Sequence, residues 1–266
     1  MRPLIFLKLG GSLITDKTRP NTLRLEHLKR AAYEISVACS KCGVRLLIGH
    51  GSGSFGHSEA SKYGIRSGVS DSREWSGFAA TARSAARLNR FVVDALWESG
   101  VPVISLQPSA SAECRDGELL FMALGPVSSA LNHGLVPLVY GDVAFDSVRG
   151  GTIISTEEIF AWLAARLRPK WILLASDVPG VVGRNGQTVP VITPASWKEL
   201  SNEVGSARGI DVTGGMHAKV RSMLDFLETS PGTRGVRIFS GLEPGNIERA
   251  ICSPLEALGT LVQSSH

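Results

Sequence analysis

Residues 8–12 of the chain read Lys8-Leu9-Gly10-Gly11-Ser12, and this stretch decides the fold. The apolar run 3–7 ahead of it predicts a buried strand that ends at the glycine pair. Because Gly10 and Gly11 have no Cβ, the backbone there can approach a polyanion closely and present its N–H groups. Lys8 and Lys17 add two cationic side chains at the same end of the chain. The stretch therefore predicts a phosphate-binding turn after the first strand.

A second glycine loop follows a second apolar strand. Residues 46–48 read Leu-Leu-Ile, and residues 49–57 continue as Gly-His-Gly-Ser-Gly-Ser-Phe-Gly-His. His57 stands at the start of a predicted helix, where a histidine N–H can donate a hydrogen bond to a phosphate oxygen. Taken alone, His57 is better explained as a helix-start histidine that faces solvent. The two phosphate-sized loops together indicate a kinase that acts on a small phosphorylated molecule.

The second loop, Gly51-x-Gly53-x-x-Gly56, also matches the dinucleotide-binding fingerprint. That fingerprint requires an acidic residue at the end of a second strand about 20 residues further on. Residues 70–74 read Ser-Asp-Ser-Arg-Glu, which predicts the start of a helix instead. Neither glycine loop ends in Gly-Lys-Ser/Thr, as a P-loop would. The sequence therefore disfavours both a nicotinamide site and a P-loop site.

Strand-like apolar runs and amphipathic helical stretches alternate along the rest of the chain. The spacing predicts helices at about 23–41, 74–99, 126–133, 156–167, 194–203 and 216–228, and strands at 101–106, 135–140, 171–175, 235–240 and 258–262. Hairpins are expected around Asp116-Gly117 and over 143–155. This order predicts an α/β fold, a three-layer α/β/α sandwich with a mainly parallel central sheet. We expect a single domain over 1–266, with two lobes that share one sheet.

Composition limits the partners and the location. The chain is 43% hydrophobic and 20% charged, as in ordinary globular proteins. Its net charge of +4, without a run of basic residues, predicts an anionic substrate and no nucleic acid. No apolar run approaches the roughly 18 residues of a membrane span, so we expect no membrane association and a cytoplasmic location. In that reducing compartment Cys39 and Cys42 are expected to be two half-buried thiols without a metal or redox role.

Five stretches in a fixed order resemble the amino acid kinase superfamily. They are 8–17 (Lys-Leu-Gly-Gly-Ser-x-x-Thr-Asp-Lys), 50–57, 140–143 (Tyr-Gly-Asp-Val), 176–178 (Ser-Asp-Val) and 211–216 (Asp-Val-Thr-Gly-Gly-Met). The combination of Lys17 with His57 resembles the isopentenyl phosphate kinases within it, and fosfomycin kinases share that combination. The resemblance implies ATP and Mg²⁺ as cofactors, a small phosphorylated isoprenoid as acceptor, and a homodimer.

The resemblance also implies roles for the matching positions. The catalytic residues would be Lys8, Lys17, His57 and Lys219. The ATP-binding residues would be Lys8, Gly10, Gly11, Ser12, Gly53, Asp177, Gly215 and Lys219. The acceptor-binding residues would be Ser52, Gly53, His57, Thr156 and Glu157. Acceptor binding falls to an N-lobe, 1–168, and nucleotide binding to a C-lobe, 169–266, with no metal held by protein side chains.

Three positions depart from the family's pattern. Ser52 stands where glycine is usual, Ser155-Thr156-Glu157-Glu158 replaces Ser-Gly-Asp-Asp, and residues 177–180 have lost one carboxylate. Because two carboxylates remain beside the lysines, we expect retained phosphorylation of isopentenyl phosphate. Thr156 fills space that glycine leaves empty, which predicts altered acceptor tolerance. The alternatives are a phosphonate kinase like fosfomycin kinase and a weakly active nucleotide-binding regulatory protein of the same fold.

Overall fold

The computed structural model of the chain describes residues 2–183, 185–201, 215–230 and 232–264, of which 57–61 and 215 are described by their backbone alone. A central sheet of eight strands runs through it in the order β10-β12-β11-β9-β1-β2-β6-β3. These strands are β1 (Leu4–Leu9), β2 (Arg45–His50), β3 (Val103–Ser105), β6 (Val136–Tyr140), β9 (Trp171–Ser176), β10 (Val191–Ile192), β11 (Gly235–Ser240) and β12 (Thr260–Val262). Every neighbouring pair is parallel except β11 and β12. The sheet joins strands of both predicted lobes.

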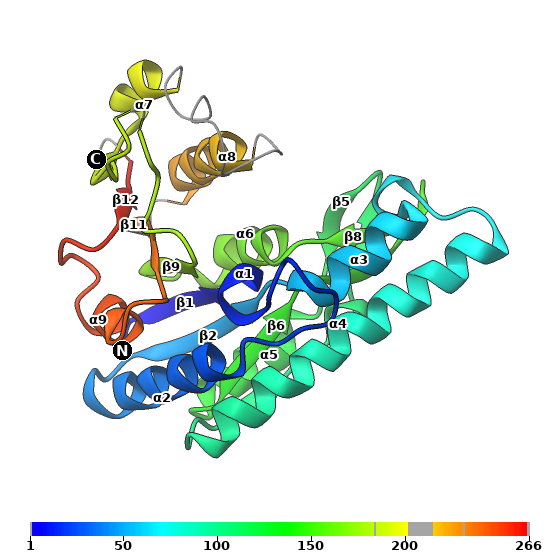
Figure 1. The fold of residues 1–266 in the computed structure, drawn as a ribbon, viewed down its shortest axis with the longest axis horizontal. Coiled ribbons are helices and arrows are strands. Elements are labelled where there is room, and N and C mark those ends of the chain that lie inside the picture. The colour runs from blue at the N-terminus through cyan, green and yellow to red at the C-terminus, as the bar shows by residue number, and fades with distance from the viewer. Residues whose placement is uncertain (1, 184, 202–214, 231, 265–266) are drawn as a thin grey trace.

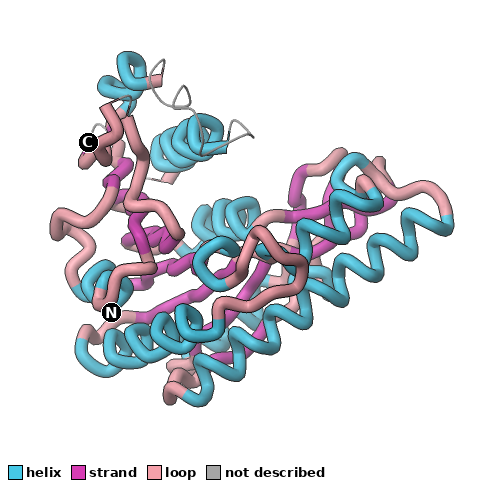
Figure 2. The backbone as a smooth tube through the Cα atoms, viewed as in Figure 1, coloured by secondary structure: helices cyan, strands magenta, loops and turns pink. Residues whose placement is uncertain are grey.

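Helices cover both faces of this sheet, and Figures 1 and 2 show the resulting layers. One face packs against α1 (Gly11–Ile14), α2 (Leu25–Lys41), α4 (Ser72–Glu98) and α9 (Asn246–Cys252). The other packs against α5 (Leu124–Asn132), α6 (Thr156–Leu167), α7 (Pro194–Leu200) and α8 (Gly215–Thr229). In β1, Ile5 and Leu7 belong to the first core and Leu4 and Phe6 to the second, as strand geometry requires. The three-layer α/β/α fold is confirmed.

A second, four-stranded sheet lies beside the central one in the order β5-β4-β7-β8. Its strands are β4 (Glu113–Arg115), β5 (Glu118–Phe121), β7 (Asp142–Asp146) and β8 (Gly150–Ile154). Asp116 and Gly117 both have positive φ, as the predicted hairpin turn requires. Burial opposes ionisation of Asp146, but four backbone N–H donors from the two hairpin turns outweigh it and lower the pKa of its carboxyl. Asp146 thereby holds both turns.

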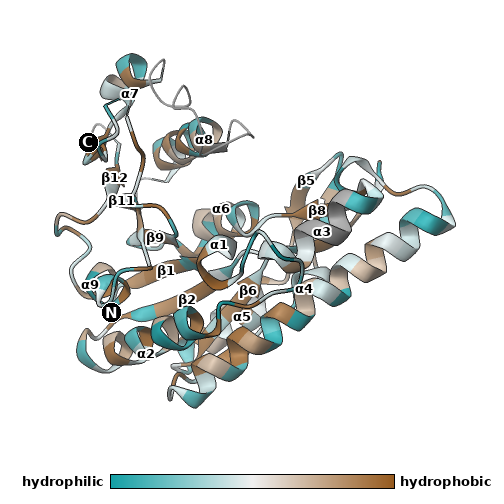
Figure 3. Ribbon diagram, in the orientation of Figure 1, coloured by the Kyte–Doolittle hydropathy of each residue, from teal (hydrophilic) through white to brown (hydrophobic). Residues whose placement is uncertain are grey.

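Helix α3 (Gly53–Tyr63) and the short 3-10 helix η1 (Ile65–Ser67) connect the second glycine loop to α4. Tyr63 packs on α4 at Gly77, where an added Cβ would lie 2.3 Å from the tyrosine ring. The hydrophobic colouring of Figure 3 follows the layers, since β1 and β2 are largely brown while α2 and α4 alternate between teal and brown. Another short 3-10 helix, η2 (Pro108–Ala110), precedes β4. None of the helices in the described ranges is long and apolar enough to span a bilayer.

Most element boundaries agree with the sequence-based expectation. Helix α6 and strand β11 occupy the predicted residues, and α4 begins two residues earlier, at Ser72, because Asp71 and Glu74 form a capping box there. Strand β10 consists of two residues, which is too short for an apolar pattern to reveal. The differences lie at element ends, in very short elements and in the 11-residue helix at 53–63, of which the sequence predicted only a start at His57.

The cysteines correct one expectation. Cys42, at the end of α2, forms a disulfide with Cys252, the last residue of α9, and their Cα atoms are 5.3 Å apart. The prediction of a free thiol is therefore wrong for Cys42, whereas Cys39 is free. At the other end of α9, the Glu34 carboxylate of α2 accepts hydrogen bonds from backbone N–H groups of residues 245 and 247. Helix α2 thus holds α9 at both ends, a pairing across 210 residues that no local pattern predicts.

Candidate active site

The predicted site residues gather at the carboxyl ends of β9, β1 and β2, which are neighbours in the central sheet. Leu9, the last residue of β1, pairs with His50 of β2 on one side and with Ala175 of β9 on the other. Both glycine loops leave the sheet at this edge. Ligands of open α/β sheets bind outside the carboxyl ends of their strands, so the topology alone makes this edge the candidate site.

The first glycine loop is fitted closely against β9. The N–H of Gly10 donates to the carbonyl oxygen of Ala175 at 2.8 Å, and a Cβ at Gly10 would lie 2.9 Å from that oxygen. Glycine is therefore required for this approach. Two residues on, the Ser12 hydroxyl donates to Asp177 Oδ1 at 2.5 Å. The structure thus brings Gly10, Ser12 and Asp177, all predicted nucleotide contacts, to one corner of the sheet.

The charged centre of the site is formed by Lys8, Glu157 and Lys219. Lys8 Nζ of β1 forms an ion pair with Glu157 at the start of α6. Burial raises the pKa of the Glu157 carboxyl, but the positive charges of Lys8 and, more weakly, Lys219 on α8 outweigh it. The net pKa is lowered, so Glu157 is ionised at neutral pH. A carboxylate that holds Lys8 in place can present its ammonium group to a polyanion.

The second glycine loop turns sharply into α3. Gly53 has a φ of 49°, in the left-handed region that favours glycine, and a Cβ there would lie 2.2 Å from the Thr15 hydroxyl oxygen. The carbonyl oxygen of Ser52 accepts the N–H groups of Phe55 and Gly56, which starts the helix. Ser52 does not have a positive φ, so its backbone conformation does not require the glycine that is usual there. The backbone of α3 includes His57, whose side chain lies outside the described residues.

His50 anchors the strand end behind this loop through a buried polar chain. With Nδ1 protonated, the ring donates to the Gly51 carbonyl at 3.1 Å, and Nε2 accepts from Asn89 Nδ2 at 3.2 Å. Asn89 Oδ1 accepts in turn from the Ser105 hydroxyl at 2.6 Å, and the His50 ring stacks on Tyr140. Burial lowers the pKa of His50 to about 4, so the ring is neutral. Sequence reasoning missed Asn89, although an asparagine on the apolar face of a predicted helix is a signal for such a partner.

Thr156 is placed differently from the expectation. Its hydroxyl donates to the His50 carbonyl at 2.6 Å, and the side chain is 1% exposed. Its methyl group is packed beside Gly49, where an added Cβ would lie 2.6 Å from it. The extra atoms of Thr156 therefore fill space between α6 and β2, rather than the acceptor space expected from the family pattern.

Glu158 has a structural task that the sequence pattern does not separate from that of Glu157. Its carboxylate accepts from the N–H of Ser155 at 2.6 Å while the Ser155 hydroxyl accepts from the N–H of Glu158, a capping box at the start of α6. The same carboxylate accepts from Arg66 Nη2 at 3.2 Å. Of the two adjacent glutamates, Glu157 alone is paired with a site lysine in the described residues.

Two of the predicted lysines are exposed. Lys17 is exposed on a loop that Asp16 closes by accepting from the N–H and the hydroxyl of Thr18, and these bonds lower the pKa of Asp16. Lys219 is exposed on α8, whose first residue is Gly215. Residues 211–214 of the fifth motif lie outside the described residues. Across the described ranges, no three His, Cys, Asp or Glu side chains are arranged to hold a metal ion.

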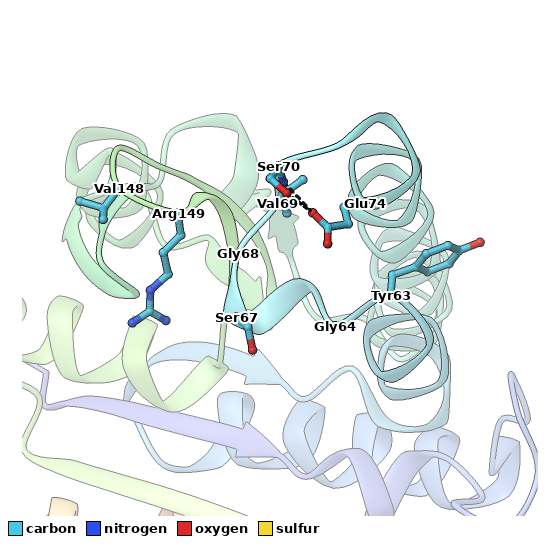
Figure 4. A pocket seen from close by; sticks show the side chains of 9 residues that line it. All are labelled: Tyr63, Gly64, Ser67, Gly68, Val69, Ser70, Glu74, Val148 and Arg149. Atoms are coloured by element: carbon cyan, nitrogen blue, oxygen red, sulfur yellow. Dashed lines mark hydrogen bonds between the residues drawn. The ribbon is translucent and has the colours of Figure 1, made fainter.

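A hollow of about 540 Å³ lies apart from this centre, between the end of α3, the start of α4 and the β7–β8 turn. Ser67, Val69, Glu74 and Arg149 are among the residues that line it (Figure 4). The predicted site residues that the structure describes do not line it. Glu74 is engaged with the N–H and hydroxyl of Ser70. The hollow therefore lies apart from the Lys8–Glu157 ion pair.

Comparison with known proteins gives a consistent result. The family model described as the amino acid kinase family matches residues 3–240. The isopentenyl phosphate kinase of Methanothermobacter thermautotrophicus is 37% identical over 276 residues, covering 99% of this chain and all of the relative. That of Methanocaldococcus jannaschii is 32% identical, covering 95% and 96%. A crystal structure of an isopentenyl phosphate kinase superimposes with a TM-score of 0.82 at 34% identity, covering 98% of this chain and all of that one.

Proposed function

The chain belongs to the amino acid kinase family, and we propose that it transfers the γ-phosphoryl group of ATP to isopentenyl phosphate. The products are isopentenyl diphosphate and ADP. One observation in the structure carries this proposal. The two glycine loops touch, since a Cβ at Gly11 would lie 2.6 Å from the Cα of Gly53. Two phosphate-binding loops in contact suit a transfer from one phosphate to another.

The chemistry requires little more than charge and position. A phosphate monoester has a second pKa of about 6, so the acceptor is largely a dianion at neutral pH. One of its oxygens attacks the γ-phosphorus while the bond from that phosphorus to the β-phosphate oxygen breaks, and ADP leaves. No general base is needed. Catalysis then depends on holding two polyanions in line and neutralising the charge of the transferring group.

We assign the residues accordingly. Lys8 and Lys219 contact the phosphates of ATP, and Lys17 bridges donor and acceptor. Gly10, Gly11, Ser12, Asp177 and Gly215 complete the nucleotide site, with Gly53 near the transferred group. Ser52 and His57 bind the acceptor phosphate. In this assignment residues 1–168 carry the acceptor site and residues 169–266 most of the nucleotide site.

Glu157 has a positioning role in this scheme. Before ATP binds, its carboxylate neutralises Lys8 and keeps the ammonium group at the end of β1. When ATP binds, its phosphates can replace the Glu157 carboxylate as the partner of Lys8, which is already held at the site. The surrounding groups fit a Mg²⁺ ion that enters with ATP, because Mg²⁺ keeps several waters and binds mainly through substrate phosphates. The ion would be carried by the phosphates and would neutralise charge on the transferring phosphoryl group.

An acceptor screen with ATP labelled at the γ-phosphate tests the proposal. Purified chain with isopentenyl phosphate should give a labelled diphosphate, and fosfomycin should give little label. Label on fosfomycin alone would replace the proposal with a phosphonate kinase. ATP binding without transfer to either acceptor would replace it with a nucleotide-binding regulatory protein. Sedimentation of the same sample checks the homodimer that the family resemblance implies.

Lys17→Met provides the matched variant for this screen. Lys17 is exposed on its loop, so its methylenes contribute little to the core. Transfer should be lost while the melting temperature stays within about 1 °C, since surface substitutions away from special features usually change stability by less than about 0.5 kcal/mol. A fall in melting temperature that accompanies the loss of activity would make Lys17 structural and remove it from the clamp.

A further inference from the structure

The two glycine loops are joined by one buried side chain that no comparison assigns to the site. Thr15 follows α1 and is 0% exposed. Its hydroxyl donates to the Gly11 carbonyl at 2.6 Å and accepts from the N–H of Ser54 at 3.0 Å. Gly11 belongs to the first loop and Ser54 to the start of α3 after the second. A single hydroxyl therefore spans from one loop to the other with both its donor and its acceptor in use.

The surroundings of Thr15 leave it little freedom to move. Its side chain is packed against Gly53, because a Cβ at that position would lie 2.2 Å from its oxygen and 2.8 Å from its methyl carbon. Its backbone forms an antiparallel bridge with Leu23. The Ser54 hydroxyl accepts the N–H of Thr22 at 3.3 Å on the same side. Thr15 is therefore held on its backbone by Leu23 and on its side chain by the two glycine loops.

We infer that Thr15 is a positioning residue that sets the spacing between the two glycine loops, and through them between the donor and acceptor phosphates. The inference rests on the proposed function. Phosphoryl transfer needs the attacking oxygen, the phosphorus and the leaving oxygen in line, and a misplacement of about 1 Å can cost about 100-fold in rate. Each loop can bind its own phosphate without Thr15, because the glycines and lysines make those contacts. Thr15 sets the distance and the alignment between the two phosphate sites.

The role predicts a separation between kcat and KM. Thr15→Val has nearly the same shape but leaves the Ser54 N–H without its acceptor, while the Gly11 carbonyl loses the hydroxyl and keeps the backbone N–H of residue 15 at 2.8 Å. The variant should lose about 10- to 100-fold in kcat, while KM for ATP and KM for isopentenyl phosphate each stay within about threefold. Thr15→Ser keeps the hydroxyl and should restore kcat to within about threefold of the native value.

A matched control separates this effect from the general cost of losing a buried threonine hydroxyl. Thr233 is 5% exposed and donates to the Pro169 carbonyl at 2.8 Å, at the opposite edge of the central sheet. Thr233→Val should lower the melting temperature as Thr15→Val does, yet leave kcat unchanged. If both variants lowered kcat equally, Thr15 would have a merely structural role.

A second measurement keeps the inference independent of the activity. Amide hydrogen exchange at Ser54 should be fast in Thr15→Val and slow in Thr15→Ser and the native chain. Native-like kcat and slow exchange in Thr15→Val would overturn the inference, as would a Thr15→Ser variant as slow as Thr15→Val. If the native chain phosphorylates no acceptor, the proposed function fails, and exchange at Ser54 then decides alone whether Thr15 ties the loops together.

Discussion

The two glycine loops leave adjacent strands at the same edge of the sheet, yet different forces hold their surroundings. Beside the first loop the contacts are charged: Lys8 pairs with Glu157, and Ser12 donates to the Asp177 carboxylate. Behind the second loop they are neutral: His50 is uncharged and hydrogen-bonded to Asn89 within the core. Both arrangements position a loop, but they respond differently to an arriving polyanion.

This difference suggests a division of labour between donor and acceptor. An ion pair in a partly exposed site can exchange its carboxylate for a phosphate at little cost, because water screens the intermediate arrangement. A buried neutral hydrogen bond cannot be exchanged without leaving a polar group unpaired, which costs about 1–3 kcal/mol. The first loop can therefore reorganise around ATP, whereas the second holds the acceptor site in a fixed geometry before binding.

The largest expected effect comes from removing the cation beside the first loop. Lys8→Met should lower kcat/KM for isopentenyl phosphate on the order of 1000-fold, because it deletes a charge that stabilises the transferring group. Steady-state kinetics measure the loss, and Lys29→Met, on the exposed side of α2, is the control that should change nothing. A loss of less than tenfold would show that the charged contact is structural and would remove the contrast between the loops.

The second effect concerns the neutral contacts behind the second loop and is measured as the pH dependence of stability. The unfolded chain protonates His50 near 6.5, whereas burial in the folded state lowers its pKa to about 4. Between these values the unfolded state binds more protons, so stability falls as the pH falls from 6.5 to 4, by about 3 kcal/mol in total. Urea unfolding of the native chain and of His50→Gln at several pH values measures the contribution of His50 to the pH dependence of the unfolding free energy. Identical pH dependence in both would mean that His50 is not held neutral.

The third effect concerns the charged contacts beside the first loop and compares substitutions of the adjacent residues Glu157 and Glu158. Glu157→Gln removes the carboxylate that orders Lys8 and should lower kcat by about 10- to 100-fold, the cost of a misplaced catalytic group. Glu158→Gln keeps a glutamine in the capping box and should change kcat by less than about twofold, because glutamine serves the N3 position as well. Equal effects from both substitutions would contradict the separate tasks seen in the structure.

Much of the fold follows from the sequence because it rests on local patterns, whereas the roles of the site residues rest on the family resemblance and stay predictions. An apolar strand that ends in Gly10 and Gly11 predicts a close-approach turn wherever it lies in the fold. The joint action of Lys8 and Lys219 on the pKa of Glu157 follows only by resemblance, since the three residues are distant in sequence and lie on different elements. The Cys42–Cys252 disulfide and the Asn89 partner of His50 depend on such packing alone, and no local rule reveals them.

The position that sequence reasoning interprets least well is Thr156. A glycine-to-threonine change at a family site suggests added bulk toward the acceptor, because sequence gives the size of a side chain without its direction. In the fold the side chain points away, and its hydroxyl donates to the His50 carbonyl at 2.6 Å. Thr156 thereby ties the strand end of the second loop to α6, the helix that carries Glu157. It is a direct link between the neutral and the charged regions.

The smallest expected effect follows from that link. Thr156→Gly restores the family residue but removes a buried hydrogen bond and a packed methyl, so unfolding free energy should fall by about 1–2 kcal/mol. The KM for isopentenyl phosphate and the ratio of activities on longer phosphorylated isoprenoids should each change by less than about threefold, because the lost atoms face β2 and not the acceptor. Thr156→Ser, which keeps the hydroxyl, should recover about half of the stability. Chemical unfolding and an acceptor series on the three proteins measure both quantities. A broadened acceptor range at unchanged stability would place Thr156 in the acceptor site after all. Thr156 would then contact the substrate in addition to linking the end of β2 to α6.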